Sequence, residues 1–202
     1  MTDAAAQVVG IYQRHAAAFD RLRSRALFEK GWLERFLAAM GRDPHVLDLG
    51  CGAGEPLARR LIERGCRVTG VDTSAALLQL ARARFPGHRW LEGDMRRLAL
   101  GERFDGILAW DSFFFLTPAD QRSMFPAFAA HATPDAALLY TSGPEACVRI
   151  GRFEGEALYH ASLDPGEYRR LLRDHGFEVL DYRAEDPECA GHTVWLARRR
   201  RA

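Results

Sequence analysis

Short apolar runs alternate along most of the chain with longer stretches in which apolar residues recur at helical spacing. The runs are almost continuously apolar, which is typical of strands buried on both faces of a parallel sheet. Gly or Pro ends several of the helical stretches, as at Gly65 and Pro86. This alternation predicts repeated strand-helix units. The predicted strands lie in 46–49, 67–72, 88–95, 104–117 and 136–142.

The two ends of the chain follow other patterns. Residues 4–20 and 22–40 place apolar side chains at helical spacing and predict two amphipathic helices before the first strand. Residues 177–183 and 193–198 predict two strands joined by a short polar loop. The stretch 143–163 is polar and has no clear period, so we expect a long loop there. Loops of that length inside a compact domain are usually functional or mobile.

Composition and charge narrow the possible classes of protein. The 202 residues suffice for one well-cored α/β domain, so we expect a single domain over residues 1–202. The formal charge of +1 argues against a dedicated nucleic-acid surface. No apolar run approaches a membrane span, and the N-terminus lacks the apolar core of a signal peptide. We therefore expect a cytoplasmic protein with no nucleic-acid or membrane partner.

The cysteines give no sign of a metal site. Cys51, Cys66, Cys147 and Cys189 are widely and irregularly separated, and no histidine stands near them at metal-ligand spacing. We expect reduced thiols and no bound metal.

A glycine-rich turn follows the first predicted strand. Gly50, Gly52 and Gly54 leave out the Cβ atoms that would keep a ligand away from the backbone. The third glycine comes one residue too early for the G-x-G-x-x-G spacing of dinucleotide-binding turns. Asp48 and Glu55 would also repel a pyrophosphate. An acidic turn of this kind suits a positively charged ligand without phosphate, such as a sulfonium.

The stretch V-L-D-L-G-C-G-A-G-E-P, residues 46–56, resembles the glycine-rich first motif of class I S-adenosylmethionine-dependent methyltransferases. The resemblance implies S-adenosylmethionine as cofactor, held here by Asp48, Gly50, Cys51 and Gly52. It also implies a Rossmann-like three-layer α/β sandwich with a mostly parallel seven-stranded sheet. Its last strand would be antiparallel, as the pair 177–183 and 193–198 indicates, and residues 4–40 would form a helical lid.

Further cofactor contacts follow from the resemblance. Asp72, at the end of the second strand, would accept hydrogen bonds from the ribose hydroxyls, with Thr73 beside it. Asp94 would accept from the adenine amino group while Met95 covers the ring, although a turn Asp that only bonds nearby backbone would look the same. Two aromatic residues complete the set. Trp110 would pack on the cofactor, and Tyr12 belongs either to the lid or simply to the apolar face of its helix.

The reaction implied is an in-line displacement on the methyl group, for which correct alignment matters most. A general base would help with some acceptors. Our candidates for catalysis are Asp111 and His160, with Tyr159 and His192 as further possibilities. A lone histidine such as His160 is also often a packing residue. The stretch 143–163 is expected to face the substrate.

The chain lacks the N-P-P-Y or D-P-P-Y string and the Pro-Cys dipeptide of enzymes that methylate nucleobases. The acceptor is therefore expected to be a small metabolite with an O, N or S nucleophile. Two alternatives stay open: a Rossmann-type NAD(P)-dependent oxidoreductase, and a module that binds S-adenosylmethionine without turnover. The protein is expected to be a monomer or a homodimer.

Overall fold

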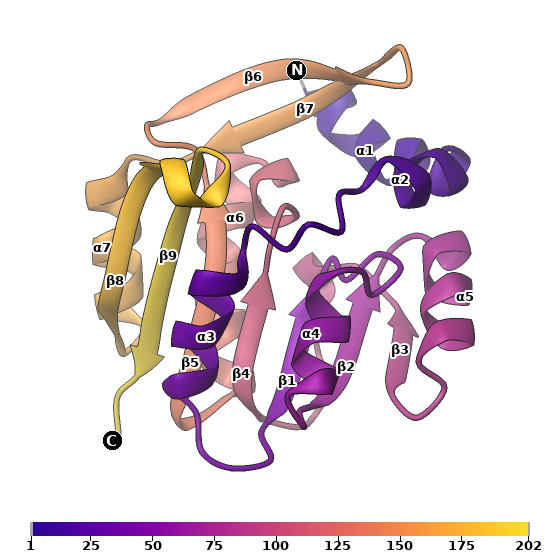
Figure 1. The fold of residues 1–202 in the computed structure, drawn as a ribbon. Coiled ribbons are helices and arrows are strands. Elements are labelled where there is room, and N and C mark those ends of the chain that lie inside the picture. Colours follow the sequence, from indigo (N-terminus) through magenta and orange to yellow (C-terminus); the bar gives the residue numbers. More distant parts are fainter. Residues whose placement is uncertain (1, 202) are drawn as a thin grey trace.

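The computed structural model describes residues 2–201, and its centre is a seven-stranded sheet in the order β3-β2-β1-β4-β5-β9-β8 (Figure 1). Strand β9 runs antiparallel to both of its neighbours, whereas the other pairs are parallel. The prediction of a mostly parallel sheet with an antiparallel last strand is confirmed. The strands are β1 (His45–Leu49), β2 (Arg67–Asp72), β3 (Arg89–Glu92), β4 (Phe104–Ala109), β5 (Ala132–Ser142), β8 (Phe177–Asp186) and β9 (His192–Arg199).

Helices cover both faces of the sheet and make it the middle of three layers. One face packs against α3 (Lys30–Ala38), α4 (Leu57–Glu63) and α5 (Ala75–Arg84) in a single apolar cluster. The other packs against α6 (Pro118–His131) and α7 (Pro165–Asp174) in a second cluster. Because apolar side chains of β1, such as Val46 and Leu47, enter opposite clusters, the strand has to be apolar on both faces.

The order of the strands creates a switch point. Strands β2 and β3 lie on one side of β1, whereas β4 and β5 lie on the other. The loops that leave β1 and β4 therefore run in opposite directions, and ligands of open α/β sheets bind in the crevice between such loops. None of the helices in the described part of the chain has the length and apolar content needed to cross a membrane.

The N-terminal segment differs from the prediction. Helices α1 (Thr2–Arg14) and α2 (Ala16–Leu22) match the first expected helix, but the second begins only at Lys30 rather than at 22. Residues 23–29 instead form an irregular connection that crosses from α2 to α3 (Figure 1). Leu27 has a φ of +45°, and Arg23 and Glu29 form an ion pair at 2.7 Å. Arg23 also lies 3.8 Å from the carboxylate of Asp111, a tertiary contact that the helical spacing of the apolar residues does not reveal.

The stretch 143–163 is not the irregular loop that we expected. It contains the hairpin of β6 (Cys147–Phe153) and β7 (Glu156–Ser162), a separate two-stranded sheet above the carboxyl ends of the main strands (Figure 1). The two turn residues, Glu154 and Gly155, have φ values of +49° and +81°, as the tight turns of hairpins require. Three short 3₁₀ helices complete the fold: η1 (Met95–Arg97), η2 (Phe113–Phe115) and η3 (Pro187–Cys189).

Candidate functional site

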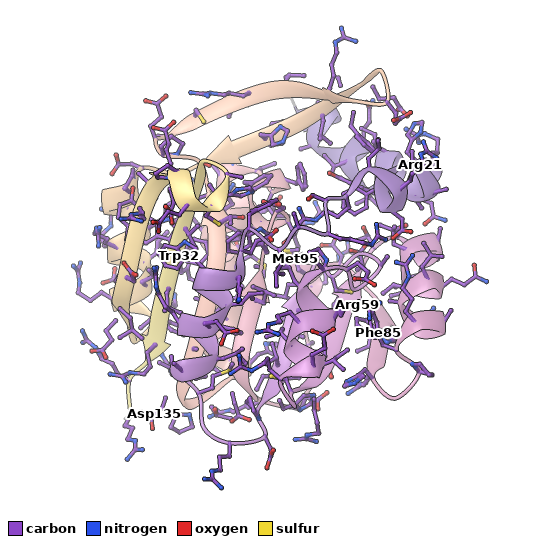
Figure 2. All side chains as sticks on the ribbon, in the orientation of Figure 1. Arg21, Trp32, Arg59, Phe85, Met95 and Asp135 are labelled. Atoms are coloured by element: carbon purple, nitrogen blue, oxygen red, sulfur yellow. The ribbon has the colours of Figure 1, made fainter. Side chains whose placement is uncertain are left out.

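A cavity opens at the switch point, between the carboxyl ends of the central strands and helices α1 and α2. It holds about 830 Å³ of empty space, including the open solvent at its mouth. Its wall brings together seven of the predicted cofactor residues and the predicted catalytic Asp111. Those eight are Tyr12, Gly50, Gly52, Asp72, Thr73, Asp94, Met95 and Asp111. Of these, Met95 is labelled near the centre of the molecule in Figure 2.

The glycine turn presents bare backbone to this cavity. Gly50 has a φ of +75°, and any Cβ there would collide with the side chain of Ser112. That serine is fixed, because its hydroxyl donates to the carbonyl of Leu49 at 2.6 Å. A Cβ on Gly52, whose φ is +53°, would enter the cavity and stand 3.5 Å from the ring of Phe19. Glycine at both positions leaves room for a ligand.

Asp72 is the best-held carboxylate of the site. One oxygen accepts the backbone N–H of Gly52 and the other that of Ser74, both at 2.8 Å. Burial raises the pKa of Asp72, and the hydrogen bonds from Ser74, Gly52 and Thr73 oppose this rise without cancelling it. A carboxylate has about four lone-pair sites, so roughly two stay free for donors in the cavity. These free acceptor sites fit the two neighbouring hydroxyl donors of a ribose.

Asp94 lies across the cavity and shares its acceptor capacity with Arg96. The guanidinium of Arg96 contacts both carboxylate oxygens, with Nε at 2.9 Å from each, and its backbone N–H donates to Oδ1 at 2.9 Å. Burial raises the pKa of Asp94, but the contacts with Arg96 outweigh this and lower it overall. Asp94 therefore stays ionised and can accept from an amino group only alongside Arg96.

The roof of the cavity is aromatic and is tied down at its edges. Tyr12 lies between Phe19, at a ring distance of 5.1 Å, and Phe153 of the hairpin, at 5.7 Å. Burial, followed by the nearby charges of Asp111 and Asp72, raises the pKa of Tyr12. The roof is joined to the body by two contacts that Arg84 of α5 makes with the carboxylate of Asp20, both at 2.6 Å.

Three predicted cofactor residues lie behind the cavity wall. Within residues 2–201, the wall does not include Asp48, Cys51 or Trp110, all of which are buried. Burial, followed by the charge of Asp72, raises the pKa of Asp48 to about 7. Cys51 donates weakly to the carbonyl of Gly52 at 3.7 Å, and burial raises its pKa. Trp110 packs in the apolar core under α3 and α4. All three support the turn and strand ends without facing the cavity.

Asp111 joins a histidine at the edge of the cavity. It has a φ of +48°, and its backbone N–H donates to the hydroxyl of Thr141 at 2.9 Å. Its carboxylate lies 2.9 Å from Nε2 of His192, whose Nδ1 lies 2.8 Å from the carbonyl of Cys189. A carbonyl and a carboxylate can only accept, so both ring nitrogens carry protons. Burial lowers the pKa of His192, but Asp111 and Cys189 reverse this and raise it. His192 is thus an imidazolium and not a free base.

A second ion pair extends this contact on the other side of Asp111. Arg23 lies 3.8 Å from the Asp111 carboxylate and 2.7 Å from Glu29, whose side chain is fully buried. The rings of Phe28 and His192 stack with centroids 5.5 Å apart. Arg23 and Glu29 were not predicted, because nothing in a helical pattern marks them as site residues. The only signal near them was the break between the predicted helices 4–20 and 22–40, which could have indicated that the chain turns inward after the first helix.

His160, the other predicted catalytic residue, faces a different cavity. That cavity lies under the hairpin, encloses about 840 Å³ including open space, and is also lined by Phe114 and Cys147. The ring of His160 stacks on Phe114 at 5.4 Å, and its Nδ1 lies 3.1 Å from the carbonyl of Leu158. Burial lowers the pKa of His160, so it is mainly neutral with Nε2 as the acceptor. Tyr159 is packed against helix α1 instead.

Comparison with known proteins agrees with this geometry. Residues 46–135 match the family model described as "Methyltransferase domain". The chain is 33% identical over 138 residues to a putative methyltransferase, YqeM, of Bacillus subtilis, a match that covers 64% of this chain. It is 54% identical over 54 residues, 25% of this chain, to trans-aconitate 2-methyltransferase of Paracidovorax citrulli. It spans only 54% and 20% of the lengths of these two relatives.

Solved structures share the fold over nearly the whole chain. The 1,6-didemethyltoxoflavin-N1-methyltransferase of Burkholderia thailandensis, solved with its substrate and S-adenosylhomocysteine, superposes with a TM-score of 0.77. The superposition covers 99% of this chain and 90% of that one at 21% identity. At this identity the likeness establishes the architecture, and the site of this chain has to be interpreted from its own residues.

Proposed function

We propose that the chain is a class I S-adenosylmethionine-dependent methyltransferase and that it transfers the methyl group of S-adenosylmethionine to an O, N or S atom of a small metabolite, a proposal supported by the methyltransferase model that matches residues 46–135. The relatives' names point to acceptors of different chemistry, trans-aconitate in one and 1,6-didemethyltoxoflavin in another. They leave the acceptor of this chain undecided.

The observation that carries the proposal is the doubly held Asp72 facing a cavity beside a bare glycine turn. Its carboxylate is fixed by two backbone N–H groups before any ligand arrives. A fixed, buried acceptor suits the two neighbouring hydroxyls of an adenosine ribose, which S-adenosylmethionine and NAD share. The third glycine of the turn comes one residue too early for a dinucleotide-binding turn, and this spacing favours methyl transfer over the NAD(P)-dependent alternative.

The chain's residues would act mainly by alignment. Asp72 would hold the ribose, Asp94 and Met95 the adenine, and the Gly50–Gly52 backbone the amino-acid end. The bound sulfonium supplies an activated methyl group. Holding donor and acceptor in line inside a closed site can lower the barrier by roughly 7 to 11 kcal/mol. Tyr12 and Phe19 in the roof would exclude water from the transfer.

Asp111 is the proposed residue at the acceptor side, because it is the predicted catalytic group that lines the cofactor cavity. His160 stays a secondary candidate. Its free Nε2 could take a proton from an acceptor that reaches the second cavity, next to the edge-to-face rings of Phe114 and Phe115. The single domain over residues 1–202, the lid at 4–40, the cytoplasmic location and the monomeric or homodimeric state remain predictions.

Labelled methyl transfer tests the proposal. The protein is incubated with S-adenosylmethionine carrying a labelled methyl group and with fractionated small-molecule pools, and S-adenosylhomocysteine is quantified. We expect label in a low-molecular-weight product together with stoichiometric S-adenosylhomocysteine. Binding of S-adenosylmethionine without turnover in any pool would favour the non-catalytic module. A thermal shift with NAD but none with S-adenosylmethionine would favour the oxidoreductase.

A further inference from the structure

The wall of the cofactor cavity is strongly acidic. Among the described residues, its charged members are Asp72, Asp94, Asp111 and Asp120 against a single arginine, Arg96, with no lysine or histidine. Arg96 lies 3.8 Å from Asp120 and also bonds Asp94, so it is already engaged by two of the four carboxylates. A negatively charged acceptor would find no free cation in this wall.

Three of these carboxylates are accounted for by a cofactor group or by a contact within the wall. Asp72 suits the ribose and Asp94 the adenine amino group under the proposed function. Asp120 accepts the hydroxyl of Thr117 at 2.9 Å at the start of α6, close to Arg96. Asp111 is the one that none of these roles explains. Its side chain is 30% exposed and lines the cavity.

The surroundings of Asp111 hold it as an oriented anion. His192 bonds one of its oxygens at 2.9 Å, and Arg23 lies 3.8 Å from the other. Arg23 also forms an ion pair with the fully buried Glu29 at 2.7 Å. The cluster therefore contains two carboxylates, Asp111 and Glu29, and two cations, Arg23 and His192. Neither Arg23 nor His192 belongs to the described wall of the cavity, so the Asp111 carboxylate keeps acceptor capacity toward the cavity.

We propose that the methyl acceptor is an amine and that Asp111 is the residue that recognises it, an inference that rests on the proposed function. The bound ammonium first loses a proton to water, because a protonated nitrogen has no lone pair. The lone pair of the free amine then forms the N–C bond, the C–S bond breaks, and sulfur keeps that electron pair. The positive charge moves from sulfur to nitrogen, and the methylated ammonium later releases a proton to water. Asp111 stabilises the charge that develops on nitrogen.

A carboxylate acceptor does not fit the same wall. Its negative charge would face Asp111 and the neighbouring aspartates with no unengaged arginine, and like charges at close range oppose binding. The aromatic rings of Tyr12 and Phe115 in the wall add to the preference, because ring faces attract cations. The acidic and aromatic lining thus selects an ammonium over a carboxylate.

Two probes of similar size and opposite charge test this inference: benzylammonium and benzoate, added to the full-length protein loaded with S-adenosylhomocysteine. Binding is measured by saturation-transfer NMR and titration. We expect benzylammonium to bind roughly tenfold more tightly than benzoate, the difference that one partly buried ion pair can give. Asp111→Asn should remove the preference and leave the affinity for S-adenosylhomocysteine unchanged.

The matched control is Asp135→Asn. Asp135 also has a positive φ, of +65°, but lies at the opposite end of the sheet (Figure 2). This variant should keep the preference. Equal or tighter binding of benzoate, no binding of benzylammonium, a preference that survives Asp111→Asn, or a loss of S-adenosylhomocysteine affinity in that variant would each overturn the inference. If wild-type protein fails to bind S-adenosylhomocysteine at all, the proposed function itself fails.

Discussion

A buried carboxyl group under the glycine turn makes stability depend on pH. Asp48 has a pKa of about 7 in the folded protein, against roughly 3.9 in an unfolded chain. Between these values the folded state binds the extra proton, so its contribution to stability is fully present at low pH and falls as pH rises to about 7. Above that pH the buried charge destabilises the fold.

We therefore predict that Asp48→Asn becomes more stable relative to wild type as pH rises from 5 to 8. The relative change would be at most about 3 kcal/mol, because the two pH units between 5 and the folded pKa each contribute roughly 1.4 kcal/mol. Urea unfolding of both proteins at the two pH values measures it, with Asp135→Asn as control. Parallel pH dependence in wild type and Asp48→Asn would show that Asp48 titrates normally.

His192 offers a second test at the level of single residues. Because Asp111 is the main group that raises its pKa against burial, Asp111→Asn should lower the pKa of His192. The stability that this pair contributes is present at low pH and is lost as pH rises through the folded pKa of His192. Histidine-selective NMR titration reads the value directly. A His192 pKa that does not move in the variant would mean that the two side chains are not coupled.

At the scale of elements, the roof formed by α1, α2 and the hairpin decides access to the cavity. Arg84 and Asp20 connect α2 to α5, and Glu156 connects β7 to Arg14 and His15 at the end of α1. These contacts lower the pKa values of Asp20 and Glu156. The Arg84–Asp20 pair thus attaches the roof to the body, and the Glu156 contacts hold the parts of the roof together; such side-chain ion pairs are individually weak.

We predict that Asp20→Asn speeds dissociation of S-adenosylmethionine several-fold, because partly buried charge-assisted hydrogen bonds each contribute about 1 to 2 kcal/mol. Stopped-flow displacement with excess S-adenosylhomocysteine measures the rate. The matched control is Asp181→Asn, which removes an exposed ion pair with Arg35 away from the cavity. Equal dissociation rates in wild type and both variants would rule out a role for this contact in closing the roof.

Much of the whole molecule was predictable from its sequence. Strands β1, β2 and β4 are buried on both faces and are short runs of mostly apolar or small residues in the sequence, and the glycine turn marks the end of β1 directly. Ser74 caps α5 as its position before the helix indicates, by accepting from the N–H of Leu77 at 3.3 Å. The strands, the glycine turn and the helix cap depend on neighbouring residues in the chain, so they can be predicted from the sequence alone.

The parts that sequence did not predict depend on distant contacts. The segment 23–29 turns inward because Arg23 meets Glu29 and Asp111, a charge network that no local pattern reveals. The hairpin escaped detection because its outer strand is exposed, with Val148 and Ile150 44% and 53% accessible, so no buried alternation marks it. The pair Glu154–Gly155 was the available signal for its turn. The contact between His192 and Asp111 was likewise not predictable, because Asp111 follows a different strand and is distant from His192 in the sequence.

Asp72 is the proposed anchor of the cofactor, and the assignment of the cavity to S-adenosylmethionine depends on it. The most direct test is calorimetric titration of S-adenosylmethionine into wild type and Asp72→Ala, with thermal unfolding to verify that the variant is folded. Losing a hydrogen-bond partner of charged type costs about 1.5 to 3 kcal/mol, so we expect affinity to fall by roughly 10- to 150-fold. Asp181→Ala should bind as wild type does. Equal affinity in a folded Asp72→Ala variant would contradict the assignment of this cavity to S-adenosylmethionine.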